Sequence, residues 1–259
     1  MGTPDRCSVT AVVISFNEGD RIASCLESVR WADEIVVVDS GSTDETREIA
    51  RNYTAKVFEI PWKGFGPQKQ AAVDRASHDR IFSLDCDERA TPELAVEIKE
   101  ILRAGNIPPA FSVPRRTFLG NKEIRRSGWY PDRTVRLFDR RHARFSDSAV
   151  HERVLVSGET GRLEHPILHF SFGGISDILS KMNRYTDLSA KQMFESGRRC
   201  GISDYTLRPF LAFARSYLFR LGFLDGVEGL EIAVSGGLHV FAKYIKLREL
   251  EQSSKGAGQ

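Results

Sequence analysis

The sequence predicts an α/β fold with a mostly parallel sheet, an antiparallel edge and a C-terminal amphipathic helical region. Through about residue 107, short apolar runs alternate with segments of helical periodicity, which is typical of doubly wound parallel sheets. After Pro108-Pro109, two strand-like runs follow without an intervening helix. The last part of the chain repeats apolar residues at helical spacing. These three observations define the expected architecture.

In the first half, the predicted strands cover residues 9–16, 34–39, 56–60 and 81–84. Helical periodicity follows the first strand, where Ile22, Cys25, Leu26 and Val29 recur on one face. Residues 42–45 form a capping-box pattern that predicts a helix to about residue 53. Residues 64–67 predict a turn, and residues 68–76 a helix. Another helix should begin after Thr91, which offers a cap before a proline and an acid.

In the second half, strands are predicted at residues 110–117, 134–138 and 167–172, and a helix from 176 to about 196. We expect residues 1–200 to form one domain, with a first half to about residue 107 and a second half from about 108. Residues 201–250 should form an amphipathic helical tail. Residues 251–259 are expected to be disordered.

The composition excludes several classes of protein. Hydrophobic residues make up 41% of the chain and charged residues 28%, as in folded proteins, and the net charge of +2 gives no reason to expect nucleic acid. The four cysteines form no CxxC pair, which fits a reducing cytoplasm better than a disulfide framework or a zinc site. A strand is expected by Val9, so we expect no signal peptide, and no apolar run is long enough to span a membrane.

Between Arg115 and Arg153, eleven Lys or Arg residues stand against five Asp or Glu residues. A solvated basic surface and a positive pocket for phosphates or an anionic acceptor both explain this excess.

Two carboxylates one residue apart, Asp85 and Asp87, follow the strand at residues 81–84 and precede a helix. In an open α/β sheet this end of a strand is where ligands bind. Paired carboxylates suit Mg²⁺ or Mn²⁺, which bind one or two carboxylates together with substrate phosphate oxygens. A solvated acidic turn is the alternative.

Several motifs occur in a characteristic order. They are Val12-Val13-Ile14-Ser15-Phe16-Asn17-Glu18, Val37-Val38-Asp39-Ser40-Gly41-Ser42-Thr43-Asp44, Leu84-Asp85-Cys86-Asp87-Glu88, Val150-His151-Glu152, Pro166-Ile167-Leu168-His169-Phe170 and Arg220-Leu221-Gly222-Phe223-Leu224-Asp225-Gly226. With them the chain resembles the family 2 glycosyltransferases of the GT-A fold, a Rossmann-like fold. Within that family it is most similar to the bacterial branch that adds glucose or a similar sugar to the lipopolysaccharide inner core. Ser40 departs from the family pattern, because many members carry a second aspartate there.

The resemblance implies a nucleotide-sugar site along the carboxyl ends of the first four strands. Ser15, Asn17 and Glu18 would lie beneath the nucleotide, and Asp39 would meet the base. Lys69 would approach the diphosphate or the ribose, although a surface lysine is an equal alternative.

The resemblance also implies metal ligands and a base. Asp85 would contact the ribose and, with Asp87, a Mg²⁺ or Mn²⁺ ion that bridges the phosphates. His169 would complete the metal shell, unless it is a satisfied core histidine. Glu152 occupies the place of the catalytic base, with Asp132 in reserve. A salt bridge with the arginine-rich segment is the alternative for Glu152.

These residues together predict an inverting, metal-dependent transfer of a hexose from a UDP-sugar to a lipid-linked saccharide. A metal would stabilise charge on the leaving diphosphate, and one carboxylate would take the proton of the acceptor hydroxyl. A haloacid-dehalogenase-like phosphatase also places Asp-x-Asp after an apolar strand, but there the motif opens the domain. A nucleotidyltransferase and a non-catalytic membrane-associated scaffold are further alternatives.

The tail carries two apolar stripes at helical spacing, flanked by arginines and lysines. Packing onto the core or a homodimer seam explains such stripes. A pair of helices on a membrane surface is the other interpretation, and it predicts a cytoplasmic protein peripheral to the inner membrane.

Overall fold

The computed structural model describes residues 8–105, 107–147 and 152–256. The chain forms two compact units. We call residues 1–116 with 132–169 the sheet unit, and residues 117–131 with 170–259 the helical unit. The chain crosses between the units within strands β6 (Ala110–Leu119) and β12 (Ile167–Phe172), and also between Pro131 and Asp132. The expected domain of residues 1–200, with halves that meet near residue 107 and a tail at residues 201–250, stays a prediction.

The sheet unit is built on four parallel strands, as predicted. In spatial order these are β3 (Val57–Glu59), β2 (Glu34–Asp39), β1 (Val9–Ser15) and β4 (Arg80–Asp85). Strand β1 pairs in parallel with both β2 and β4, so the chain order reverses at β1. The carboxyl ends of β1, β2 and β4 therefore meet at a topological switch point, where open α/β sheets bind ligands.

The expected antiparallel edge is confirmed. Strand β8 (Asp132–Asp139) runs antiparallel to both β4 and β6. Strand β5 (Glu88–Ala90) follows the Asp-x-Asp motif and pairs antiparallel with β12, with His169 opposite Glu88. Three short strands complete the unit: β9 (Ala143–Phe145), β10 (Val154–Val156) and β11 (Thr160–Arg162).

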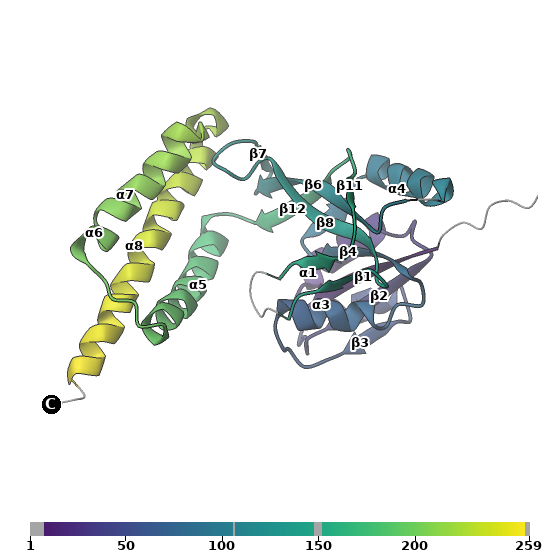
Figure 1. Ribbon diagram of the computed structural model, residues 1–259, viewed down its shortest axis with the longest axis horizontal. Coiled ribbons are helices and arrows are strands. Elements are labelled where there is room, and N and C mark those ends of the chain that lie inside the picture. The colour runs from purple at the N-terminus through teal and green to yellow at the C-terminus, as the bar shows by residue number, and fades with distance from the viewer. Residues whose placement is uncertain (1–7, 106, 148–151, 257–259) are drawn as a thin grey trace, which may run out of the picture. The chain divides into compact units, whose positions relative to one another are not determined.

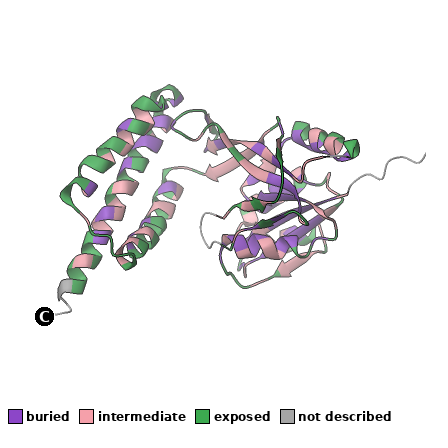
Figure 2. Ribbon diagram, viewed as in Figure 1, coloured by how far each residue is buried: buried purple, intermediate pink, exposed green. Residues whose placement is uncertain are grey.

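Helices cover both faces of the sheet, and the strand residues alternate between two cores (Figures 1 and 2). Helices α1 (Gly19–Ser28), α2 (Thr46–Arg51) and α4 (Pro92–Ala104) pack on the face that contains Val13 and Phe82. Helix α3 (Phe65–Val73) packs on the opposite face, with Val12. The sheet unit is therefore the three-layered, Rossmann-like α/β structure that the sequence predicts.

Two local predictions are wrong. Residues 42–45 do not form a capping box, because the Ser42 hydroxyl donates to Asp39 and Asp44 accepts from Gly19 and Thr46. Helix α2 begins only at Thr46. The turn predicted at residues 64–67 is also shorter, because α3 begins at Phe65. At the start of α4, by contrast, the Thr91 hydroxyl accepts from the Leu94 amide as the sequence predicts.

The helical unit consists of strand β7 (Lys122–Ile124) and a set of packed helices. They are α5 (Ile175–Glu195), α6 (Ile202–Tyr205), α7 (Leu207–Ala214), the π-helical turn η1 (Arg215–Phe219), the 3₁₀ turn η2 (Gly222–Asp225) and α8 (Val227–Gly256). Helices α5 and α7 both run alongside α8 (Figure 1). Close packing depends on Gly237 of α8, whose missing Cβ would lie 3.1 Å from the Pro209 carbonyl oxygen.

The prediction of a disordered segment from residue 251 is wrong for the residues that the structure describes, because α8 continues to Gly256. Residues 257–259 lie outside the described part of the chain. Among the described helices, none is both long enough and apolar enough to cross a bilayer.

Candidate functional site: a chain of charges at the strand ends

The loops after β1 and β2 are tied together around Asp39, which is fully buried. One carboxylate oxygen of Asp39 accepts from the amides of Gly41 and Ser42, at 3.0 and 2.7 Å. The other accepts from the hydroxyls of Ser15, at 2.8 Å, and Ser42. Asp39 therefore fixes the shape of this loop. A donor group on a nucleotide base would have to replace one of these four bonds.

Asn17 and Glu18 join the same loop from the β1 side. Asn17 adopts a left-handed backbone conformation with φ of 53°, which asparagine tolerates better than most residues. Its amide donates to the Ser42 hydroxyl, and its side-chain oxygen accepts from the Thr43 amide at 2.9 Å. The Glu18 amide donates to the Thr46 hydroxyl. Ser15, Asn17, Glu18 and Asp39 thus belong to one hydrogen-bonded assembly at the carboxyl ends of β1 and β2.

Lys69, on α3, connects two of the predicted site residues. Its ammonium group lies 2.8 and 3.1 Å from the two carboxylate oxygens of Asp85 and 2.7 Å from Glu152 Oε1. The Lys69 side chain is only 5% exposed, so this contact is largely shielded from water. Lys69 is therefore an internal lysine held between two carboxylates, rather than a surface lysine.

Two arginines continue the contacts from Asp85. Arg136 Nη2 donates to Asp85 at 3.0 Å and to Glu88 at 2.6 Å. Arg115 donates to the same Glu88 oxygen at 3.2 Å and, through Nε, to Asp132 at 2.8 Å. Glu88 also accepts from the Asp85 amide through its other oxygen. Glu88 is fully buried, and two arginines satisfy its charge.

Together these residues form one alternating series of acids and bases, which we call the charge chain. Its members in order are Glu152, Lys69, Asp85, Arg136, Glu88, Arg115 and Asp132. The two residues predicted as catalytic base and reserve base stand at its ends, where the side chains are 18% and 36% exposed. Of the interior members, Lys69, Arg136 and Glu88 are at most 5% exposed.

The charge chain shifts the pKa of three of its members. Burial on its own raises the pKa of Asp85, but Lys69 and Arg136 outweigh burial and bring it well below its usual range. Burial on its own lowers the pKa of Arg136, and the carboxylates of Glu88 and Asp85 reverse this and raise it. The pKa of Arg115 is raised in the same way, against burial, by Glu88 and Asp132. Asp85 is therefore an anion, and both arginines are cations, throughout the neutral range.

Arg136 has one unused donor. Among the residues that the structure describes, its buried Nε has no hydrogen-bond partner. A buried donor without a partner usually costs about 1–3 kcal/mol, so such a group is often a place where a ligand or an ordered water binds. Arg136 lies one bond from Asp85, so this donor belongs to the predicted diphosphate region.

The predicted metal ligands separate into two groups. The imidazole Nε2 of His169 lies 3.4 Å from a carboxylate oxygen of Asp87. Two ligands of one small divalent ion, each bound at about 2.1 Å, lie roughly 3 Å apart, so this pair fits Mg²⁺ or Mn²⁺. Asp85 instead has both oxygens in contact with Lys69 or Arg136. Among the described residues, no three His, Cys, Asp or Glu side chains form a ready ligand group.

Glu88, Arg115 and Arg136 were not among the residues that the sequence singled out. Glu88 directly follows the Asp-x-Asp motif, and a charged residue between the predicted strand and helix gave no reason to expect burial. The two arginines belong to the arginine-rich segment of residues 115–153. Some of its basic residues face the site, and others form a solvated surface. Arg136 is 5% exposed and faces the site, whereas Arg125 and Arg144 are more than 60% exposed.

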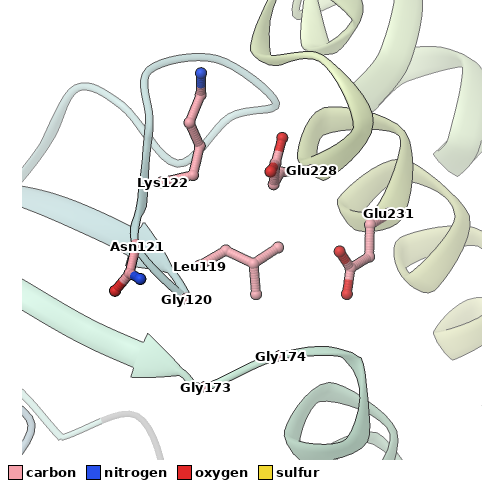
Figure 3. A pocket seen from close by; sticks show the side chains of 8 residues that line it. All are labelled: Leu119, Gly120, Asn121, Lys122, Gly173, Gly174, Glu228 and Glu231. Carbon is pink, nitrogen blue, oxygen red and sulfur yellow. The ribbon is translucent and has the colours of Figure 1, made fainter.

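The helical unit contains an open pocket of about 450 Å³ (Figure 3). Its lining residues are Leu119, Gly120, Asn121, Lys122, Gly173, Gly174, Glu228 and Glu231. The Glu228 and Glu231 side chains of α8 lie across the pocket from Leu119 and Lys122, which flank the turn between β6 and β7 (Figure 3). None of the predicted site residues lines this pocket, and we assign it no role.

Comparison with known proteins gives the family. The model of the family described as glycosyl transferase family 2 matches residues 10–165, which is more than half of the chain. The chain belongs to glycosyl transferase family 2. The resemblance inferred from the motifs is therefore confirmed. This family 2 glycosyltransferase is an enzyme, so the phosphatase, nucleotidyltransferase and scaffold alternatives are set aside.

The glycosyltransferase is similar to proteins that it matches over nearly their whole length. It is 32% identical to the lipopolysaccharide core biosynthesis glycosyltransferase LpsC of Rhizobium meliloti, over 92% of this chain and 91% of the relative. It is 28% identical to an uncharacterized glycosyltransferase of Rickettsia conorii, over 95% and 90%. A crystal structure of S. aureus TarS 1–349 aligns over 97% of this chain and 92% of that chain at 16% identity. Its TM-score of 0.47 is too low to support an inference about the site.

Proposed function

We propose that this glycosyltransferase transfers a hexose, most simply glucose, from a UDP-sugar to a lipid-linked saccharide of the lipopolysaccharide core type. The contact that carries the proposal is the Lys69 ammonium group between Asp85 and Glu152. It joins the motif expected at the donor diphosphate to the carboxylate expected to activate the acceptor. The similarity to LpsC, whose name refers to lipopolysaccharide core biosynthesis, supports the choice of acceptor.

On the donor side, Ser15, Asn17, Glu18 and Asp39 form the floor for the nucleotide, with Asp39 at the base. Asp85 and Lys69 lie at the ribose and the diphosphate. Arg136 brings a second cation to the same strand end, through its contact with Asp85. These cations are held in place before the substrate arrives, so they need little reorganisation to stabilise the leaving group.

Asp87 and His169 would hold the divalent ion, Mg²⁺ or Mn²⁺, and Asp85 would join them only by giving up part of its contact with Lys69 or Arg136. When bound, the ion would supply positive charge to the departing diphosphate. The carboxylate suits both ions, whereas the imidazole nitrogen suits Mn²⁺ better than Mg²⁺, a harder cation that prefers oxygen ligands.

On the acceptor side, Glu152 is the proposed base. The acceptor oxygen forms a bond to the anomeric carbon while the bond from that carbon to the diphosphate oxygen breaks. The proton of the hydroxyl passes to Glu152, and UDP leaves. Lys69 orients the Glu152 carboxylate. A single displacement with one base inverts the anomeric centre. Asp132 remains the reserve base, at the far end of the charge chain.

We also propose that residues 1–200 carry this chemistry, and that residues 201–250 hold the enzyme on the cytoplasmic face of the inner membrane. A homodimer is the competing use of the tail.

The direct test is a screen of nucleotide sugars, with and without Mn²⁺, that measures hydrolysis and thermal unfolding. The correct donor at 100 times its dissociation constant should stabilise the folded protein by about 2.7 kcal/mol. Purified lipopolysaccharide core acceptors then identify the transfer product. Stabilisation by no UDP-sugar, with or without metal, would contradict the proposed donor class.

A further inference from the structure

We propose that residues 202–227 of the helical unit, which we call the apolar segment, form a docking surface for an anionic lipid bilayer. The inference builds on the proposed function, since a lipid-linked acceptor is confined to a membrane. The segment includes α6, α7, η1 and η2. The proposal depends on which side chains the fold leaves uncovered, and not only on the helical spacing of the apolar residues in the tail.

The apolar segment exposes side chains that soluble proteins normally bury. Ten large apolar residues between 202 and 227 are exposed, and Phe219 is 82%, Val227 76% and Phe210 64% accessible. By contrast, Ala214 is the only apolar side chain of α7 that is buried. Ten exposed large apolar residues within 26 positions are typical of a segment that binds another apolar surface.

The fold buries the acidic side chains of the apolar segment and leaves its arginines exposed. Its two acids, Asp204 and Asp225, are both buried. Asp225 accepts from the backbone amides of Arg125 and Arg126, at 3.2 and 2.8 Å, and Asp204 pairs with Arg208.

The basic residues remain outside. Arg208, Arg215 and Arg220 are all exposed. Arg125 and Arg126, held beside η2 by Asp225, are exposed too. Within residues 202–227 the exposed ionic groups are therefore all cationic.

This combination of exposed apolar side chains and exposed arginines matches the surface of an anionic leaflet. The apolar side chains enter the boundary between head groups and acyl chains, and the arginines meet the lipid phosphates. A second copy of the chain fits less well. In a two-fold interface the same surface meets itself, so two cationic surfaces would face each other with no exposed acid in the segment to pair with the arginines.

The test uses the full-length protein and vesicles of phosphatidylethanolamine and phosphatidylglycerol, compared with vesicles of phosphatidylcholine alone. Co-sedimentation with the anionic vesicles is expected at low salt. It should weaken at least about tenfold when the salt rises to roughly 0.5 M, where the screening length falls to a few ångströms. Phosphatidylcholine vesicles should bind less at every salt concentration.

Matched variants locate the surface. Phe219→Ser combined with Leu224→Ser should reduce vesicle binding about tenfold or more, whereas Val96→Ser on α4, where Val96 is 55% exposed, should not. Arg215→Glu should reduce binding about fivefold or more at low salt, and Arg103→Glu, exposed on α4, should leave it unchanged. Unfolding temperatures and hydrolysis of the nucleotide sugar control for folding and for the catalytic unit.

Equal vesicle binding by the Phe219→Ser, Leu224→Ser protein and by wild type would overturn the proposal. It would also be overturned if the wild-type protein ignored anionic vesicles and instead formed a dimer in light scattering that the same substitutions dissociate. Either result leaves donor hydrolysis, and hence the proposed transferase reaction, unaffected.

Discussion

In the sheet unit, ionised side chains are drawn inward and paired, whereas in the helical unit apolar side chains are left on the surface. Glu88 and Arg136 are nearly inaccessible and satisfy each other, while Phe219 and Val227 are more than three-quarters exposed. Burying charge is costly, and exposing apolar surface is costly as well. The two units therefore depart from an ordinary soluble fold in opposite directions. Each departure lies where we place a function: chemistry in the sheet unit and lipid contact in the helical unit.

The most severe test of this comparison is Glu152→Gln, at one end of the charge chain. The amide keeps the shape of the side chain but cannot accept the proton of the acceptor hydroxyl. Turnover should fall by about 10²- to 10⁴-fold, while the affinity for the nucleotide sugar changes little. Steady-state kinetics and calorimetry measure the two quantities. Asp132→Asn is the matched control, and a larger loss of turnover in that variant would transfer the role of base to Asp132.

A substitution at the centre of the charge chain should act on stability. Glu88→Ala removes the buried carboxylate shared by Arg136 and Arg115, so that Arg136 keeps only Asp85 and Arg115 only Asp132 as an acidic partner. The free energy of unfolding in urea should fall by about 3–5 kcal/mol. Glu231→Ala, on α8, should change it by less than about 0.5 kcal/mol. Comparable losses of unfolding free energy in both variants would mean that Glu88 contributes no more to stability than Glu231 does.

Acid denaturation should show that Glu34, a second acid of the sheet unit, stabilises the fold. Although burial on its own raises the pKa of Glu34, Lys56, the Ser77 amide and Thr10 lower it from 4.5 to about 2. A carboxyl group with a depressed folded-state pKa stabilises the protein above its unfolded value, and this contribution is lost as the pH falls from about 4.5 to 2. Across that window wild type should lose about 1–2 kcal/mol more stability than Glu34→Gln, because solvent screens the partly exposed pair with Lys56. The exposed Glu48→Gln variant should follow wild type.

The smallest expected effect concerns the metal. Asp87→Ala removes one of the two donors that face each other across 3.4 Å. Because a ligand is lost, the affinity for Mn²⁺ in the presence of UDP should fall about 10- to 100-fold. The substitution lies in a turn at the strand end, so it should leave the core intact. Calorimetric titration measures it, with Asp147→Asn, whose side chain is 89% exposed, as the control. Unchanged affinity would remove Asp87 from the metal site.

Local sequence determined much of the fold. The buried strands at residues 9–16, 34–39 and 81–84 are apolar on both faces, so their composition alone shows that helices cover both sides of the sheet. The Thr91 cap was predicted correctly because its partner, the Leu94 amide, is three residues away. The Ser42 cap was predicted wrongly because distant partners compete for that hydroxyl and its neighbours, as the Asn17 amide does.

What only the tertiary structure decided is the pairing of residues far apart in the chain. Glu152 lies 83 residues from Lys69, and Arg136 lies 48 from Glu88, and the strand order and register bring them together. The tail follows the same rule. Helical spacing identified its apolar stripes, but the spacing does not show which other residues cover them.

The sequence by itself therefore determined the strands, the tail periodicity and the family, because these depend on local pattern and ordered motifs. The fold decided which charges became internal and which apolar side chains stayed exposed, because burial depends on neighbours that the local sequence does not contain.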